Sequence, residues 1–493
     1  MTGHAYNSVR RCRTAIAKAI FTVGTTTALG ACSAGDQTGD SGTPTIAAPT
    51  AEPVRVALAN SPQSATAGIV FSYDATKGGT AFTGTALRYV VTFAPSANGL
   101  TATNGRIGGA PTVAGFTTAT IVATDASGAS VSNAFPIVVF SADLAAPTLP
   151  VTPYTYSDAT SPLPAHFTLA VGGGRGVGGS VVAADNTPAS NVTTDAGAAL
   201  GRVLFYERRL SVNDRVSCAS CHQQQTGFAD TARLSRGFDG GSTGRHSMAL
   251  QNARFYTRGR FFWDERAATL EAQVLQPIQD ATEMGMTLEN AVTKLTLSSF
   301  YAPLFQAAFG TPDITSDRVS RALSQFVRSL VSSSSKFDRA FTNVTTGPPN
   351  FAAVFTPQEQ LGQQLFNGQA KCAQCHETNA HLGDDVHNIG LDATLTDVGA
   401  GLGRFKTPSL RNVEKRGRFM HDGRFNTLEQ VVEFYNSGVQ NNGNLDGRLR
   451  GPGNQPQRLN LSQAEKDAIV AYMKTLTDDA FLTAAKFSNP FPR

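Results

Sequence analysis

Cysteine is scarce in this chain of 493 residues, and the six cysteines leave none for a disulfide framework. Cys12 lies in the N-terminal leader and Cys32 follows an apolar stretch. The other four form two Cys-x-x-Cys pairs, each followed directly by a histidine. A small fold held together by disulfides is therefore excluded.

Long apolar segments and a strong charge of one sign are also missing. No segment approaches the ~18 consecutive apolar residues that a membrane-spanning helix needs. The formal net charge of +4 is small for this length, and no run of five or six like charges occurs. Neither nucleic acid nor an anionic membrane surface is a predicted partner.

Residues 1–32 predict a lipoprotein signal peptide. A short apolar stretch at 19–29 follows four basic residues, Arg10, Arg11, Arg13 and Lys18. The ending Leu29-Gly30-Ala31-Cys32 is similar to a bacterial lipobox, in which Cys32 carries the lipid; the alternative is an ordinary cleavage site with an incidental cysteine. We expect a protein on the periplasmic side of the bacterial envelope, anchored through Cys32 to the outer membrane or cell surface.

Three segments of different composition follow the leader. Residues 33–50 are rich in Gly, Ser, Thr, Asp and Pro and predict a flexible tether. Residues 51–142 show short alternating stretches between turn signals, which is typical of a β-sandwich, and the run from Gly99 to Val139 resembles bacterial immunoglobulin-like, cadherin-like domains. This domain is a spacer or a binding module. Residues 143–190 include a Gly-rich stretch and predict a linker.

From Thr194 onward the pattern is helical, and it repeats itself. The block Leu-Gly-x-x-Leu-Phe begins at Leu200 and again at Leu361. The block Asp-x-Arg-x-x-Thr-Leu-Glu follows Trp263 in one copy and His421 in the other. We therefore predict a mainly α fold, with tandem cytochrome c-like haem domains at 191–345 and 346–493 behind the small all-β domain.

Each copy contains a Cys-x-x-Cys-His motif, formed by Cys218, Cys221 and His222 and by Cys372, Cys375 and His376. The two thiols of such a motif add to the haem vinyl groups, and the histidine ligates the iron. A zinc site or a redox dithiol would not explain the histidine after both pairs. We predict two covalently bound haem c groups.

The two copies differ where a sixth iron ligand would lie. In register, Pro277 stands opposite Tyr435, and Trp263 opposite His421. Proline offers no ligand, so the first iron is expected to be open. Tyrosine can ligate haem iron, so Tyr435 is a candidate sixth ligand that would close the second.

An open iron that cleaves peroxide needs a group that moves a proton between the two oxygens. Gln273 and Glu283 flank Pro277 and are the candidates, although a Glu and a Gln on a helix are more often surface residues. Trp263, the single tryptophan, suits an electron relay between the haems, with packing as the alternative.

From about Thr194 to its end the chain resembles the bacterial diheme cytochrome c peroxidases, which include the MauG-type enzymes. The resemblance rests on six motifs: CASCH, FFWDERAATLEAQ, PIQDATEM, CAQCH, GRFKTPSLRNV and MHDGRFNTLEQVVEFYNSG. It implies that Glu283 is the distal acid–base residue, Gln273 its partner and Trp263 the bridge between the haems. The first haem would then bind peroxide and the second would receive electrons.

The chain departs from the family pattern in two places. Tyr435 stands where many of these peroxidases have a methionine ligand. A tyrosine at this position is similar to the MauG-type enzymes, which oxidise tryptophans of a partner protein. Met420 is an alternative ligand. The region of the family's distal histidine has Arg236, and His246 lies closer to the position of a calcium-binding asparagine. The first iron is thus expected to be open without prior reduction. One calcium ion between the domains is in doubt, although carbonyls near Arg416 and Arg418 could contribute.

The expected function is the reduction of hydrogen peroxide to water by a cytochrome-c peroxidase. A small c-type cytochrome or a cupredoxin would donate the electrons, and a homodimer is compatible with the resemblance. One alternative is a MauG-like oxidase acting on a protein or small molecule, which Tyr435 favours. The other is an electron-transfer diheme cytochrome without catalysis.

Overall fold

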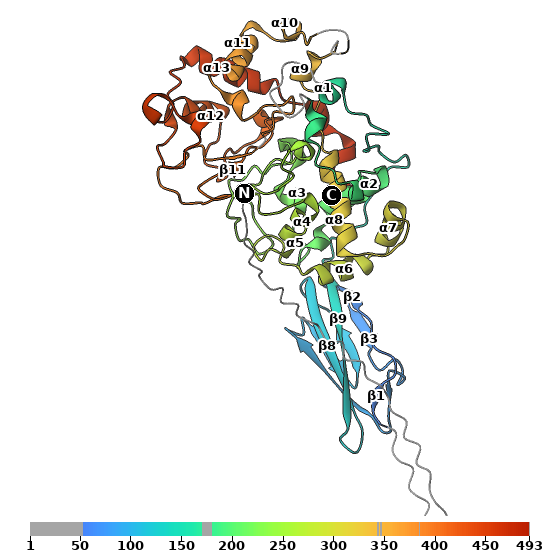
Figure 1. Ribbon diagram of the computed structural model, residues 1–493. Coiled ribbons are helices and arrows are strands. Elements are labelled where there is room, and N and C mark those ends of the chain that lie inside the picture. The colour runs from blue at the N-terminus through green and yellow to red at the C-terminus, as the bar shows by residue number, and fades with distance from the viewer. Residues whose placement is uncertain (1–52, 170–179, 343–344, 346–347, 384, 493) are drawn as a thin grey trace, which may run out of the picture. The chain divides into compact units, whose positions relative to one another are not determined.

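The computed structural model describes residues 53–169, 180–342, 345, 348–383 and 385–492 (Figure 1). The expected signal peptide, the lipid-bearing Cys32 and the tether lie outside these residues. Within the described part, no helix is long and apolar enough to cross a membrane. The thiols of both Cys-x-x-Cys pairs are free.

The first described region is built of strands, coloured blue to cyan in Figure 1. Its elements are β1 (Arg55–Val56), β2 (Gln63–Thr66), β3 (Phe71–Asp74), β4 (Phe82–Thr83), β5 (Arg88–Ala94), β6 (Leu100–Thr103), β7 (Arg106–Gly109), β8 (Gly115–Thr124) and β9 (Ser130–Phe140). They form sheets ordered β2-β9-β8-β5 and β3-β7-β6, plus the pair β1-β4. Strand β2 runs parallel to β9, and the other pairs are antiparallel.

Both larger sheets contribute to one hydrophobic cluster. Ile121 on β8 and Phe135 on β9 pack with Ile107 on β7, and each is at most 2% exposed. The alternation of apolar and polar residues thus produces the predicted β-rich region. Its closer likeness to immunoglobulin-like domains stays a prediction.

The segment predicted as a linker packs against the helical region wherever it is described. It contains α1 (Ala165–Thr168), η2 (Val181–Ala184) and η3 (Ala189–Asn191). Phe167 is fully buried, and the imidazole of His166 lies 2.7 Å from the carboxylate of Asp338. The Tyr156 hydroxyl donates to the carbonyl of Lys486.

The remainder is mostly helices and loops, coloured green to red in Figure 1. The first copy contains α2 (Asp195–Tyr206), α3 (Cys218–Cys221), α4 (Leu270–Gln273), α5 (Gln276–Gln279), α6 (Leu288–Thr296), α7 (Tyr301–Phe309), α8 (Ser316–Ser329) and α9 (Lys336–Arg339). The second contains α10 (Phe351–Val354), α11 (Pro357–Asn367), α12 (Leu428–Glu433), the π-helical turn η9 (Phe434–Gly438), α13 (Gln463–Lys474), α14 (Asp479–Thr483) and the short strands β10 (Val386–His387) and β11 (Phe405–Lys406).

Single turns of 3₁₀ helix connect these elements. They are η4 (Arg208–Leu210), η5 (Gln224–Thr226), η6 (Ala253–Phe255), η7 (Cys372–Gln374), η8 (Val413–Lys415), η10 (Gly447–Leu449), η11 (Pro452–Asn454) and η12 (Ala485–Phe487). Helices α11 and α13 both begin with a capping box, at Thr356 and Ser462, as their sequences indicate.

A glycine in each copy allows two helices to pack in close contact. A Cβ atom on Gly201 of α2 would lie 1.9 Å from the carbonyl oxygen of Ala322 on α8. On Gly362 of α11 it would lie 1.9 Å from the carbonyl oxygen of Ala468 on α13. The repeated Leu-Gly-x-x-Leu-Phe block therefore allows two helices to pack closely, once in each copy.

Candidate active site and haem-binding sites

The first cavity contains the Cys218–Cys221–His222 motif. Helix α3 carries both cysteines and ends at His222. The cavity has a volume of about 400 Å³. The predicted catalytic residues Trp263, Gln273 and Glu283 line it together with these three residues and Pro277. Residues 218–222 and residues 263–283 thus meet around one space.

The backbone orients the His222 ring. Its Nδ1 donates a hydrogen bond to the carbonyl oxygen of Phe228, 2.9 Å away, and burial lowers the pKa of the ring. The imidazole is therefore neutral, with Nε2 left to ligate iron. Phe228 has a positive φ of 60°, a conformation that non-glycine residues rarely adopt.

Glu283 lies on a loop whose backbone is held on both sides. Its amide N–H donates to the side chain of Asp280, and its carbonyl accepts from the amide of Phe238. The side chain is half-buried, and burial raises the pKa of its carboxyl above the ordinary 4.5, as does the charge of Asp280. A carboxyl with a raised pKa beside a haem cavity suits proton transfer.

Arg266 also lines the first cavity; it belongs to the repeated Asp-x-Arg block, but no role was predicted for it from the sequence. Its guanidinium lies 3.5 Å from the ring centroid of Phe262 and donates to Asp264 at 3.0 Å. The positive charge of Arg266 opposes the rise in the pKa of Glu283. Its counterpart Arg424 is instead held by Asp392 and Asp422 and lies outside the lining of the second cavity.

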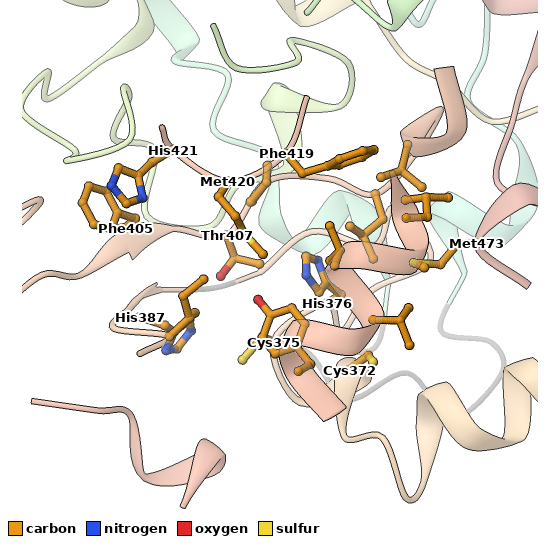
Figure 2. A pocket seen from close by; sticks show the side chains of 18 of the residues that line it. Cys372, Cys375, His376, His387, Phe405, Thr407, Phe419, Met420, His421 and Met473 are labelled. Atoms are coloured by element: carbon orange, nitrogen blue, oxygen red, sulfur yellow. The ribbon is translucent and has the colours of Figure 1, made fainter. Parts of the chain in front are cut away.

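The second cavity, of about 180 Å³, contains the Cys372–Cys375–His376 motif. Figure 2 shows Met420 and Thr407 around the same space as His376, with Phe405 and His421 side by side at one end. The His376 Nδ1 contacts the carbonyl oxygen of His381 at 3.2 Å, and burial lowers the pKa of His376 to about 4. This ring, too, is neutral and oriented by a backbone oxygen.

Tyr435 lines the second cavity, as the register predicts. It lies on the π-helical turn η9 that follows α12, an irregularity often found at functional sites. Burial raises the pKa of its phenol, and its hydroxyl has no hydrogen-bond partner within the described residues. Met420 lines the same cavity, so both candidate sixth ligands are present there.

Trp263 lines both cavities. Its indole N–H donates to the carbonyl oxygen of His246 at 2.7 Å, and its ring centroid lies 6.5 Å from that of His421. The ring of His421 stacks on Phe405 with a centroid distance of 3.6 Å. Trp263 and His421, which occupy the same position in the register of the two copies, therefore contact each other between the two sites.

The donor sets fit two haem c groups. Each cavity offers two thiols and one neutral imidazole, and apolar side chains line most of the remaining wall. Sequence reasoning missed the backbone acceptors at Phe228 and His381. The type of a residue does not indicate whether its carbonyl receives a hydrogen bond.

Comparisons with known proteins identify the family of the helical region. The family model described as di-haem cytochrome c peroxidase matches residues 195–346 and 356–484. The methylamine utilization protein MauG of Methylorubrum extorquens is 35% identical over 300 residues, which cover 59% of this chain and 80% of that protein. The cytochrome c551 peroxidase of Nitrosomonas europaea is 31% identical over 294 residues, or 57% of this chain and 80% of that protein.

One solved structure supports the fold as well. The crystal structure of a MauG-like protein associated with microbial copper homeostasis covers 62% of this chain and 96% of its own. Its TM-score is 0.55 at 28% sequence identity.

Proposed function

Because the chain belongs to the di-haem cytochrome c peroxidase family, we propose that it reduces hydrogen peroxide at the Cys218–His222 site. Electrons enter at the Cys372–His376 site from a small c-type cytochrome or a cupredoxin. Each turnover consumes one peroxide, two electrons and two protons, and releases two waters.

The difference between the two cavities carries this proposal. Pro277, which stands in register with Tyr435 and offers no ligand to iron, lines the first cavity beside Glu283 and Gln273. Tyr435 and Met420 line the second, and either side chain can ligate it. The iron with an open coordination site would bind and cleave peroxide, and the iron with a sixth ligand would store an electron.

The side chains of the first cavity move the protons. When bound, the haem there supplies the iron that binds peroxide and delivers electrons to it. Glu283, as carboxylate, accepts the proton of the near oxygen and returns it to the far oxygen, which leaves as water. Gln273 orients the substrate through its amide, and the charge of Arg266 favours the carboxylate form of Glu283.

Trp263 connects the two sites. Its contacts with His246 and His421 fix the indole between the two cavities. Because a backbone carbonyl accepts the indole N–H, no side-chain base is positioned to remove that proton. We assign Trp263 to electron transfer from the second site to the first.

One experiment tests the assignment in the holoprotein. Spectra of the fully oxidised form should show one high-spin and one low-spin haem, and reduced cytochrome c should support rapid peroxide turnover. Two low-spin haems with negligible turnover would overturn the proposal and favour the electron-transfer cytochrome.

A second candidate function is the oxidation of a protein or small molecule, as in MauG-type enzymes. The presence of Tyr435 in the second cavity favours it. In that case stoichiometric peroxide should produce a long-lived oxidised state and poor turnover with cytochrome c. Tyr435→Phe should shorten the life of that state, whereas under the peroxidase assignment the variant should retain most of its turnover.

We place this activity on the periplasmic side of the envelope, with Cys32 as the lipid anchor. The strand region of residues 53–140 would then hold the haem domains away from the membrane. A homodimer remains compatible with this arrangement. Mass spectrometry of the membrane fraction would show whether Cys32 is lipidated.

A further inference from the structure

Arg416 is a buried cation without a carboxylate partner among the described residues. The residue is 8% exposed, and burial lowers the pKa of its guanidinium to about 9. Nη2 donates to the carbonyl oxygens of Ser409 and Arg411, while Nε is buried with no partner. By contrast, the fully buried Arg411 forms a bidentate pair with Asp338. A buried positive charge is costly unless an anion compensates it.

A second incomplete group lies near Arg416. His246 is 4% exposed, and its Nδ1 contacts the carbonyl oxygen of Arg233, while its Nε2 is buried without a partner. The positive charge of Arg416 contributes to the lowered pKa of His246. Both side chains line the Cys372–His376 cavity. Nε of Arg416 is a donor that calls for an anionic or polar acceptor, whereas Nε2 of His246 is an acceptor because Nδ1 carries the proton.

These two side chains belong to different haem domains. The His246 amide donates to the carbonyl oxygen of His421 at 2.8 Å, and the Arg233 side chain donates to the carbonyl oxygen of Asp422. The segment from Arg416 to Gly423 therefore packs directly on the first domain. We call this contact the interdomain seam.

Within the described residues, the seam offers no cluster of carboxylates to the calcium ion that the resemblance left in doubt. Calcium takes six to eight oxygen ligands, usually with carboxylates among them. The described residues contain no group of three or more His, Cys, Asp or Glu that could hold a metal. A guanidinium at this place would also repel a divalent cation.

We propose that Arg416 supplies the positive charge at the interdomain seam. Its guanidinium pairs with a carboxylate of the haem bound at Cys372 and Cys375. The two propionates of a haem are anions that enter the protein with the cofactor. Arg416 lines the cavity of that haem, and its unpartnered Nε is buried there. A haem carboxylate would give Nε of Arg416 the acceptor that it lacks among the described residues, and no calcium is required. This inference depends on haem attachment and not on peroxide as the substrate.

Redox titration of the holoprotein, followed by the absorption of each haem, tests the pairing. Arg416→Gln removes a positive charge that opposes the ferric state, so the potential of the second haem should become more negative. The potential of the first haem should change less. Arg416→Lys keeps the charge, so the potential of its second haem should lie between those of Arg416→Gln and the unmodified protein. Arg404→Gln removes an exposed charge from the same domain, outside the cavity lining, and serves as the matched control.

The metal content of the unmodified protein gives an independent test that requires no variant. Elemental analysis should find less than one calcium per ten chains. Addition of EGTA, and then of calcium, should leave both haem spectra and the melting temperature unchanged. Stoichiometric calcium with a spectral response to EGTA would overturn the proposal. So would an Arg416→Gln variant with the same potentials as Arg404→Gln. Neither readout uses peroxide turnover, so a failure of the proposed function would be recognised separately.

Discussion

The two haem domains are alike in how they would hold the iron and different in what faces it. In both, a backbone carbonyl orients the proximal imidazole, and the residue that supplies it has a positive φ. In both, the threonine of the shared Asp-x-Arg block caps the helix that begins at the next residue. In the first copy this helix ends and Pro277 follows at the start of α5, whereas in the second α12 continues into the π-helical turn with Tyr435. The two copies thus differ in this helix, which places Pro277 in one copy and Tyr435 in the other.

The largest expected effect comes from removing the acid–base group of the first cavity. Glu283→Gln keeps the size of the side chain but cannot accept a proton, so peroxide turnover should fall by about 100-fold or more. Stopped-flow absorption would measure the reaction with peroxide. Glu289→Gln, on an exposed position of α6, is the control. An unchanged rate in Glu283→Gln would remove Glu283 from the proton transfer.

The matched glycines test whether both copies depend on the same packing. Gly201→Ala and Gly362→Ala each place a Cβ against a backbone carbonyl, and each should cost about 1–3 kcal/mol of stability. Thermal unfolding followed by circular dichroism would detect this loss. Gly443→Ala has open space around its Cβ and should have little effect. Equal melting temperatures in all three variants would contradict the close packing.

The two matched arginines should affect different properties. Arg266→Gln removes a charge that favours the carboxylate of Glu283, so the rate with peroxide should fall about tenfold. Arg424→Gln should leave that rate nearly unchanged, because Arg424 is paired with Asp392 and Asp422 away from the cavity. Its loss should lower the melting temperature instead. Similar rate losses in both variants would indicate a structural role for Arg266.

The smallest expected effect is a shift of the acid limb of kcat/KM for peroxide to higher pH. Glu283 must be a carboxylate to accept a proton, and burial raises its pKa above 4.5. The carboxylate is present above that raised pKa and is lost as the pH falls through it, so kcat/KM should decline earlier than for an ordinary Glu. Stopped-flow rates from about pH 4 to about pH 8 would show this limb. The limb should move to higher pH in Arg266→Gln and disappear in Glu283→Gln.

The sequence was sufficient to predict much of the site, because its chemistry depends on residue types in a fixed order. The Cys-x-x-Cys-His motifs predicted the attachment points, and the register of the repeat assigned Glu283 and Tyr435 to different cavities. The carbonyl acceptors could not be predicted, because any residue can supply a carbonyl. The lack of a carboxylate partner for Arg416 could not be predicted either. It depends on burial by segments that are distant in the sequence, and the spacing of residues does not indicate that burial.

The packing of residues 148–169 determines where the chain can be shortened. The amide of Thr148 donates to the carbonyl oxygen of Pro490, and His166 and Phe167 are buried beside the haem domains. A protein that begins at residue 191 would leave Asp338 without His166 and expose the surface that Phe167 covers. One that begins near residue 145 would keep both contacts, so expression of the haem region by itself should start there.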